Sequence, residues 1–157
     1  MTLEIGSQAP DFTLTTDDGG SVALSDLAGK PVVLYFYPRA NTPGCTKQAC
    51  AFNDSLPAFD SDKAVIIGVS KDSVKKLSNF KTKYDLNFAL ASDAETTTCE
   101  DYGVWVEKKM YGKTFMGIER ATYLIGPDGK IAEIWRKVKV PGHADEVLEA
   151  VTKLQAA

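Results

Sequence analysis

The chain has 157 residues, of which 44% are hydrophobic and 25% charged, and a formal net charge of −3 at pH 7. This length and composition predict a single globular domain, residues 1–157, with an ample core. The lysines are scattered, which argues against a nucleic-acid surface, and no apolar run approaches the roughly 20 residues of a membrane span. The first residues lack a basic region followed by an apolar core, so we expect a cytoplasmic protein. Three cysteines, an odd number, fit catalytic or inert thiols better than a secreted disulfide framework.

The first half of the chain begins with two short strand candidates and then one long apolar run. The expected elements are strands at 9–14 and 21–24 around a turn at 16–20, a helical turn at 25–30, a strand at 32–37, and a helix from Cys45 to Phe59. Pro57 is expected to kink this helix or end it early.

The second half alternates strands and helices and then forms a hairpin. We expect a strand at 64–69, a helix at 72–84 capped by Asp72, a brief strand at 88–91 and a short helix from Asp93 towards Tyr102. After these we expect a charged loop at 107–117, a hairpin of 121–125 and 131–135, and a final helix that begins at 141–145. This order predicts an α/β fold, with a mixed sheet and helices on both faces.

Cys45 is the main candidate for chemistry. It follows a Thr-Pro-Gly break at the start of the expected helix, where unpaired backbone N–H groups and the helix dipole favour the reactive thiolate. Pro-Gly before Cys45 and the polar residues 46–48 after it argue against deep burial. Cys50, five residues further along the same helix, is a possible second sulfur for a disulfide.

The pattern Pro38-x-x-x-Thr42-x-x-Cys45 resembles the peroxidatic motif of the peroxiredoxins. The longer string of residues 35–50 resembles the bacterioferritin-comigratory, or PrxQ, subfamily, and the similarity runs from residues 6–12 to the last helix. It implies a thioredoxin-like fold with the peroxiredoxin N-terminal extension. It also implies a thiol peroxidase that acts on hydrogen peroxide and organic hydroperoxides without a cofactor or metal, is recycled by thioredoxin, and is monomeric.

The same resemblance assigns roles to individual residues. It implies a sulfenic acid on Cys45, then a Cys45–Cys50 disulfide with Cys50 as the resolving residue. Arg120 matches the active-site arginine in its position before a core strand, and Gln48 matches the Glu or Gln that orients it. Peroxide chemistry also needs donors, which the Thr42 hydroxyl and the backbone N–H groups near Gly44 and Cys45 can supply. Pro38 is expected to fix the loop and shield the sulfur, while roles for Arg39 and Arg136 stay open, and neither is included in the site.

Helix geometry places a condition on the disulfide. Residues five apart on an α-helix have Cα atoms roughly 8.7 Å apart, from a 1.5 Å rise and 3.6 residues per turn. A disulfide needs about 4.4–6.8 Å. We therefore predict that the bond between Cys45 and Cys50 requires the first turns of the helix to unwind.

Other residues and functions are weighed against this interpretation. His143 is expected to be a surface or capping residue and Trp105 a packing residue. Cys99 is expected to be a structural or incidental thiol, with a backup resolver or regulatory thiol as its rival role. A thioredoxin-type thiol–disulfide oxidoreductase is the alternative function, although no C-x-x-C is present. A zinc module of Cys45, Cys50, Cys99 and His143 matches no common ligand spacing.

Overall fold

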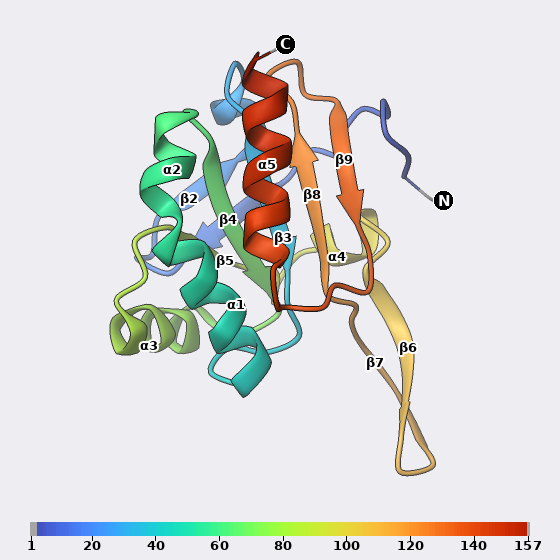
Figure 1. Cartoon of the computed structure of the whole chain (residues 1–157). Helices are drawn as coiled ribbons and strands as arrows, with labels where there is room; N and C mark the ends of the chain where they lie inside the picture. The colour runs from blue at the N-terminus through green and yellow to red at the C-terminus, as the bar shows by residue number, and fades with distance from the viewer. Residues whose placement is uncertain (1–2, 157) are drawn as a thin grey trace.

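The computed structural model describes residues 3–156, which form a seven-stranded mixed sheet flanked by helices (Figure 1). The strand order is β2-β1-β5-β4-β3-β8-β9, with β3 parallel to β4 and antiparallel to β8. The strands are β1 (Thr13–Thr16), β2 (Ser21–Ala23), β3 (Val32–Phe36), β4 (Val65–Ser70), β5 (Ala89–Ser92), β8 (Ala121–Ile125) and β9 (Ile131–Trp135). The expected mixed sheet is therefore confirmed, and the β8–β9 hairpin has the predicted bounds.

Side-chain alternation along β3 divides the core in two. Val32, Leu34 and Phe36 join one buried cluster, while Val33 and Tyr35 join the other. The second cluster lies under the longer helices, α1 (Pro43–Asp54), α2 (Leu56–Ser61), α3 (Val74–Tyr84) and α5 (His143–Ala156). Because successive strand residues point to opposite faces, every residue of this strand is buried and β3 is fixed between two layers.

The opposite face is covered by shorter elements. These are the N-terminal segment, the 3₁₀ turn η1 (Leu24–Leu27) and α4 (Thr98–Asp101), which contribute Phe12, Leu24 and Cys99 to the first cluster. The N-terminal extension adds β1 and β2 to the sheet through antiparallel pairing of β1 with β5. Helices thus lie on both faces as predicted, but the first strand begins at Thr13 instead of residue 9.

The early stop expected near Pro57 is confirmed, but the expected cap of the next helix needs correction. The helix that holds Cys45 stops at Asp54, and α2 follows after Ser55, so Pro57 lies in the first turn of a second helix. This early break agrees with proline's preference for helix starts. Helix α3 is capped by Ser73, whose side chain accepts from the Lys76 N–H, and not by Asp72.

The expected loop at 107–117 is wrong. Those residues form a hairpin, β6 (Trp105–Met110) and β7 (Lys113–Ile118), which projects away from the sheet (Figure 1). Tyr111 (φ 52°) and Gly112 (φ 75°) both adopt positive φ, as a two-residue hairpin turn requires. The hairpin is exposed on both sides, so its strands lack the apolar alternation that identifies a half-buried strand.

The longest helix is α5, with 14 residues. Within residues 3–156, no helix combines the length and apolar character needed to cross a membrane.

Candidate functional site: the Cys45 thiol

Cys45 lies in the first turn of α1, after Pro43 and Gly44, directly beyond the loop that leaves β3. The first intrahelical bond runs from the Thr46 N–H to the Thr42 carbonyl, 2.8 Å. The Thr42 side chain makes no capping bond; its hydroxyl donates to the Arg39 carbonyl at 2.8 Å. The N–H groups of Gly44 and Cys45 precede the helical ladder, so they are free to bind an oxygen placed against the sulfur.

The Cys45 thiol is 2% exposed, so the expectation that it avoids deep burial is wrong. Its own helix does not bury it alone, because Arg120, the residue immediately before β8, also lies against it. Arg120 Nη2 lies 3.3 Å from Cys45 Sγ, within hydrogen-bonding distance for a sulfur acceptor. A Cβ atom at Gly44 would lie 3.3 Å from the same nitrogen, so glycine here allows the guanidinium to approach closely.

Gln48 holds the other side of the guanidinium. Its Oε1 atom accepts from Arg120 Nη1 at 2.6 Å, and the side chain is buried one turn after Cys45. Within residues 3–156 Arg120 makes no ion pair with a carboxylate, so a neutral amide orients it and its charge is available to the sulfur. The structure thus brings together Cys45, Gln48 and Arg120.

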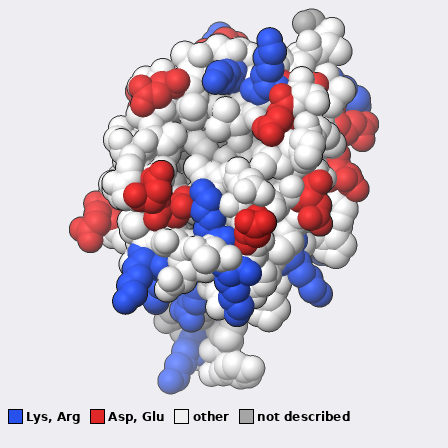
Figure 2. Space-filling model, turned by 90° about the vertical axis from the view of Figure 1, so that its left-hand side faces the viewer, with Lys and Arg blue, Asp and Glu red and all other residues white. Residues whose placement is uncertain are grey.

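The thiol opens onto a cleft of about 800 Å³ that also contains Pro38, Thr42 and Arg120 in its lining. Pro38 is exposed at the rim of this cleft, where its ring restricts the loop. The far wall comes from the β6–β7 hairpin. Lys and Arg side chains gather at the lower end of the molecule, the end towards which this hairpin projects (Figures 1 and 2).

Cys50 lies on the same continuous helix as Cys45, and both are free thiols. It is partly exposed, whereas Cys45 is buried. Burial and the nearby Asp54 carboxylate raise the pKa of Cys50, which keeps this thiol protonated while the helix is intact.

Asp72 is a structural residue of the site that sequence reasoning assigned elsewhere. Its Oδ2 atom accepts from the Ala40 N–H at 2.7 Å and from the Ser70 hydroxyl at 2.8 Å. Asp72 therefore ties the cysteine loop to the end of β4 instead of capping α3. The local sequence around Asp72 does not reveal this role, because its partner Ala40 lies 32 positions away in the chain.

His143 is buried, so the expected surface position is wrong. Its Nε2 atom lies 2.8 Å from the Thr122 hydroxyl, and its ring packs edge-on against Phe52 and Trp135. Burial, reinforced by the positive charge of Arg120, lowers its pKa to about 4. His143 begins α5 as predicted, but its side chain is neutral and lies in the core.

Cys99 lies in the buried cluster on the opposite face of the sheet from Cys45. Burial and the Asp93 carboxylate raise the pKa of Cys99 far above its ordinary value. A shared zinc ion is therefore ruled out by position, and the residues described contain no cluster of three His, Cys, Asp or Glu side chains suited to a metal.

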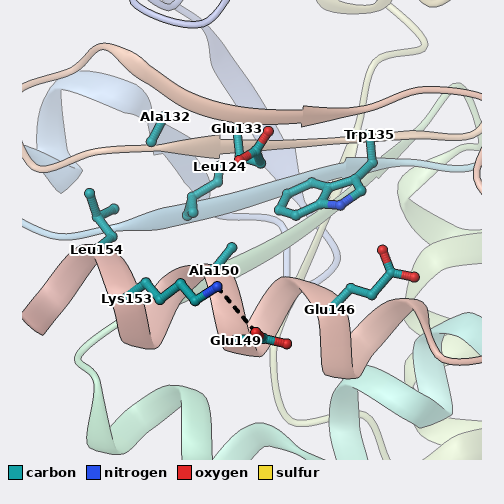
Figure 3. A pocket seen from close by; sticks show the side chains of 9 residues that line it. All are labelled: Leu124, Ala132, Glu133, Trp135, Glu146, Glu149, Ala150, Lys153 and Leu154. Atoms are coloured by element: carbon teal, nitrogen blue, oxygen red, sulfur yellow. Dashed lines mark ion pairs between the residues drawn. The ribbon is translucent and has the colours of Figure 1, made fainter.

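A second groove, of about 480 Å³, lies between α5 and strands β8 and β9 (Figure 3). Trp135 and Leu124 face it from the strands, and Glu149 and Lys153 form a 3.2 Å ion pair on the helix. None of the three cysteines lines this groove, whereas Cys45 lines the first cleft.

Comparison with known proteins agrees with this geometry. The profile of the AhpC/TSA family matches residues 5–134, and the chain belongs to that family. It is 51% identical over 151 residues to the peroxiredoxin Bcp of Bacillus subtilis, covering 96% of each chain. Within the family, the chain is a peroxiredoxin of the Bcp, or PrxQ, subfamily and thus a thiol peroxidase.

Two solved structures show the same thioredoxin-like fold. The bacterioferritin comigratory protein of Xanthomonas campestris, studied for its alkyl peroxide reduction activity, superposes with a TM-score of 0.90 at 44% identity and 98% coverage of both chains. The PrxQ of Xylella fastidiosa gives a TM-score of 0.92 at 41% identity, again with 98% of each chain covered. The alternative thioredoxin-type oxidoreductase is not favoured by these relatives.

Proposed function

We propose that Cys45 is the peroxidatic residue and that it reduces hydrogen peroxide and organic hydroperoxides. The observation that carries this assignment is the 3.3 Å approach of Arg120 Nη2 to Cys45 Sγ in a cleft open to solvent. The Cys45 thiolate attacks one peroxide oxygen, a sulfur–oxygen bond forms and the O–O bond breaks. Cys45 becomes a sulfenic acid, and the departing oxygen takes a proton and leaves as water or an alcohol.

The surrounding groups stabilise the charge that moves between these oxygens. Arg120 supplies a full positive charge, and the N–H groups of Gly44 and Cys45 supply two further donors at the helix start. The Thr42 hydroxyl, directed by its bond to the Arg39 carbonyl, presents its oxygen lone pairs to the approaching hydroperoxide, whose O–H can donate to them. Pro38 holds the loop, and Gln48 holds the arginine.

Cys50 is the proposed resolving residue. Its thiol attacks the sulfenic acid, water leaves, and a Cys45–Cys50 disulfide forms. Both residues belong to one unbroken helix, so the first turns of α1 must unwind for the sulfurs to meet. Unwinding also brings Cys50 into water, which removes the burial that raises its pKa.

The proposed cycle ends with reduction by thioredoxin. A dithiol donor attacks the disulfide, a mixed disulfide forms, and the donor's second thiol releases both cysteines while becoming oxidised itself. This cycle needs a reducing compartment, so we place it in the cytoplasm and assign it to a monomer acting as one domain, with no cofactor.

Mass spectrometry after one equivalent of hydrogen peroxide tests both cysteine roles. Reduced protein is expected to give a Cys45–Cys50 disulfide, and Cys50→Ser is expected to give a sulfenic acid on Cys45 that dimedone traps. A Cys45–Cys99 disulfide would keep the peroxidase and overturn the resolver. Persistent peroxide with Cys45 still reduced would overturn the proposed function.

A further inference from the structure

The β6–β7 hairpin carries most of the large apolar side chains that the described residues expose. Five such side chains are exposed within residues 3–156, and four of them belong to this hairpin: Met110 (56%), Tyr111 (96%), Phe115 (43%) and Met116 (49%). Among the described strands, β6 and β7 pair only with each other, as a separate two-stranded sheet. Figure 1 shows the ribbon standing clear of the main sheet.

Tyr111 has an unfavourable backbone conformation for an aromatic residue. It takes φ 52° in the two-residue turn, where Asn or Gly is strongly preferred and an aromatic side chain is strained. Its side chain is 96% exposed, so it gains almost nothing from packing within the chain. A residue whose backbone strain is not offset by packing within its own chain is a candidate for contact with another molecule.

The charge around the hairpin is positive although the chain as a whole carries −3. Within residues 105–118 there are three lysines, Lys108, Lys109 and Lys113, against the single carboxylate Glu107. Arg39 and Lys76 join Lys108 in the lining of the Cys45 cleft, and none of these cations forms an ion pair within the described residues. On the face that Figure 2 shows, basic side chains also gather towards this lower end of the molecule.

The hairpin also forms one wall of the cleft that leads to Cys45. Met110, Phe115 and Met116 line that cleft together with the thiol itself. A protein that contacts the hairpin is therefore placed beside the sulfur that must be reduced in each cycle. Exposed apolar side chains within a basic rim match a partner whose reactive thiol is surrounded by apolar residues and carboxylates.

We propose that the β6–β7 hairpin is the docking surface for an acidic dithiol reductant protein of the thioredoxin type. This inference rests on the proposed function, because it presumes a Cys45–Cys50 disulfide. Docking positions the partner's thiolate against the disulfide; a mixed disulfide forms, one cysteine leaves as a thiolate and takes a proton, and the partner's second thiol completes the two-electron transfer.

The test compares two reductants on two matched variants. The docking variant is Tyr111→Asn with Lys109→Gln and Lys113→Gln, none of which lines the cleft, and Asn-Gly is the favoured pair for such a turn. The control is Ile5→Asn with Lys30→Gln and Lys130→Gln, which removes one exposed apolar side chain and two charges around the β8–β9 turn, none of them in the lining of the Cys45 cleft. Peroxide turnover is measured with dithiothreitol, and with an acidic bacterial thioredoxin regenerated by its reductase and NADPH.

The docking variant is expected to lose about tenfold in kcat/KM for thioredoxin, while its rate with dithiothreitol equals that of the wild type. The control is expected to match the wild type with both reductants. Added salt is expected to slow thioredoxin-driven turnover of the wild type more than that of the docking variant.

Three results would overturn the docking surface. They are an unchanged kcat/KM for thioredoxin, an equal loss with dithiothreitol, and a wild type that turns over with dithiothreitol but not with thioredoxin. A wild type that fails with dithiothreitol as well would instead overturn the peroxidase itself, so the two failures are distinguishable.

Discussion

Arg120 and Cys45 are joined by a 3.3 Å contact between Nη2 and Sγ, although they lie 75 positions apart in the chain. The sheet makes this possible, because β8 runs antiparallel to β3 and begins where β3 ends, at the pairing of Phe36 with Ala121. The residue before β8 and the loop after β3 therefore meet at one edge of the sheet. The guanidinium of Arg120 thus contacts a sulfur whose residue is almost completely shielded from water.

Replacing Arg120 is expected to impair the peroxide step. Arg120→Gln removes the charge from the developing oxyanion, and the loss of one such donor costs about 10²-fold in rate. Arg120→Lys is expected to recover only part of this, since an ammonium cannot bond Gln48 and Cys45 in the same fork-like geometry. The measurement is kcat/KM for hydrogen peroxide with dithiothreitol as reductant, and a fully active Arg120→Gln would exclude the proposed role.

Gln48 is expected to act through the arginine and not on the peroxide. Gln48→Ala deletes the 2.6 Å bond to Arg120 Nη1 and is expected to lower kcat/KM for peroxide about tenfold, in line with a hydrogen bond to a charged group. Gln48→Glu keeps an acceptor at the same place and should restore most of the rate. Lys47→Ala, an exposed neighbour in the same turn, is the control. Equal rates for Gln48→Ala and the control would leave Gln48 without a positioning role.

Much of this site could be anticipated from the sequence, because its parts lie in short strings. The break before Cys45, the position of Arg120 before a strand and the helix that contains Gln48 were all predicted, and the structure places these residues in contact. The burial of Cys45 was not predicted. Local polarity describes a residue's neighbours in the chain, whereas Cys45 is covered in part by Arg120, which lies 75 positions away.

The errors share a physical cause. The 107–117 loop was predicted because a ribbon exposed on both sides has no apolar alternation, and the left-handed turn at Tyr111 uses a residue that does not signal a turn. His143 and Asp72 were misplaced because each bonds a partner from another element, Thr122 and Ala40 respectively. Such tertiary contacts cannot be read from local periodicity.

Cys99 is expected to be inert in the folded enzyme. It is fully buried, and its raised pKa keeps the thiol protonated. Ellman's reagent should therefore titrate Cys99 only after denaturation, and Cys99→Ser should turn over at the wild-type rate with dithiothreitol. A loss of turnover in a variant with unchanged thermal stability would support the rival role as a backup resolver.

Acid is expected to destabilise the fold through His143. Its pKa is lowered to about 4, while an unfolded histidine titrates near its ordinary value of 6.5. Between these values the unfolded chain binds a proton that the folded chain does not, so stability falls as the pH drops from 6.5 to 4, by about 3 kcal/mol in total. Denaturant unfolding across this range should show the loss in the wild type and a smaller loss in His143→Gln. Parallel curves for the two proteins would contradict this assignment.

Tyr35 is expected to favour the unwinding of α1. Its hydroxyl is fully buried without a hydrogen-bond partner among the described residues, its ring stacks on Phe52 of α1, and both Cys45 and Cys50 lie within electrostatic reach. An unpaired buried hydroxyl costs about 1–3 kcal/mol. This cost is removed once the helix opens and water can hydrogen-bond to the hydroxyl. Tyr35→Phe should therefore stabilise reduced protein by about 1 kcal/mol and slow formation of the Cys45–Cys50 disulfide about fivefold.

The matched control for Tyr35 is Tyr123→Phe. Tyr123 is equally buried on the neighbouring strand, but its hydroxyl donates to the Tyr102 carbonyl at 2.6 Å. Removing that hydroxyl leaves a buried acceptor without its donor, so Tyr123→Phe should lower the free energy of unfolding, opposite in sign to Tyr35→Phe. Guanidinium unfolding of reduced protein gives both free energies, and stopped-flow tryptophan fluorescence after a peroxide pulse gives the disulfide rate. Stabilisation by Tyr35→Phe without a slower disulfide step would show that the hydroxyl strains the fold as a whole and not the helix that has to open.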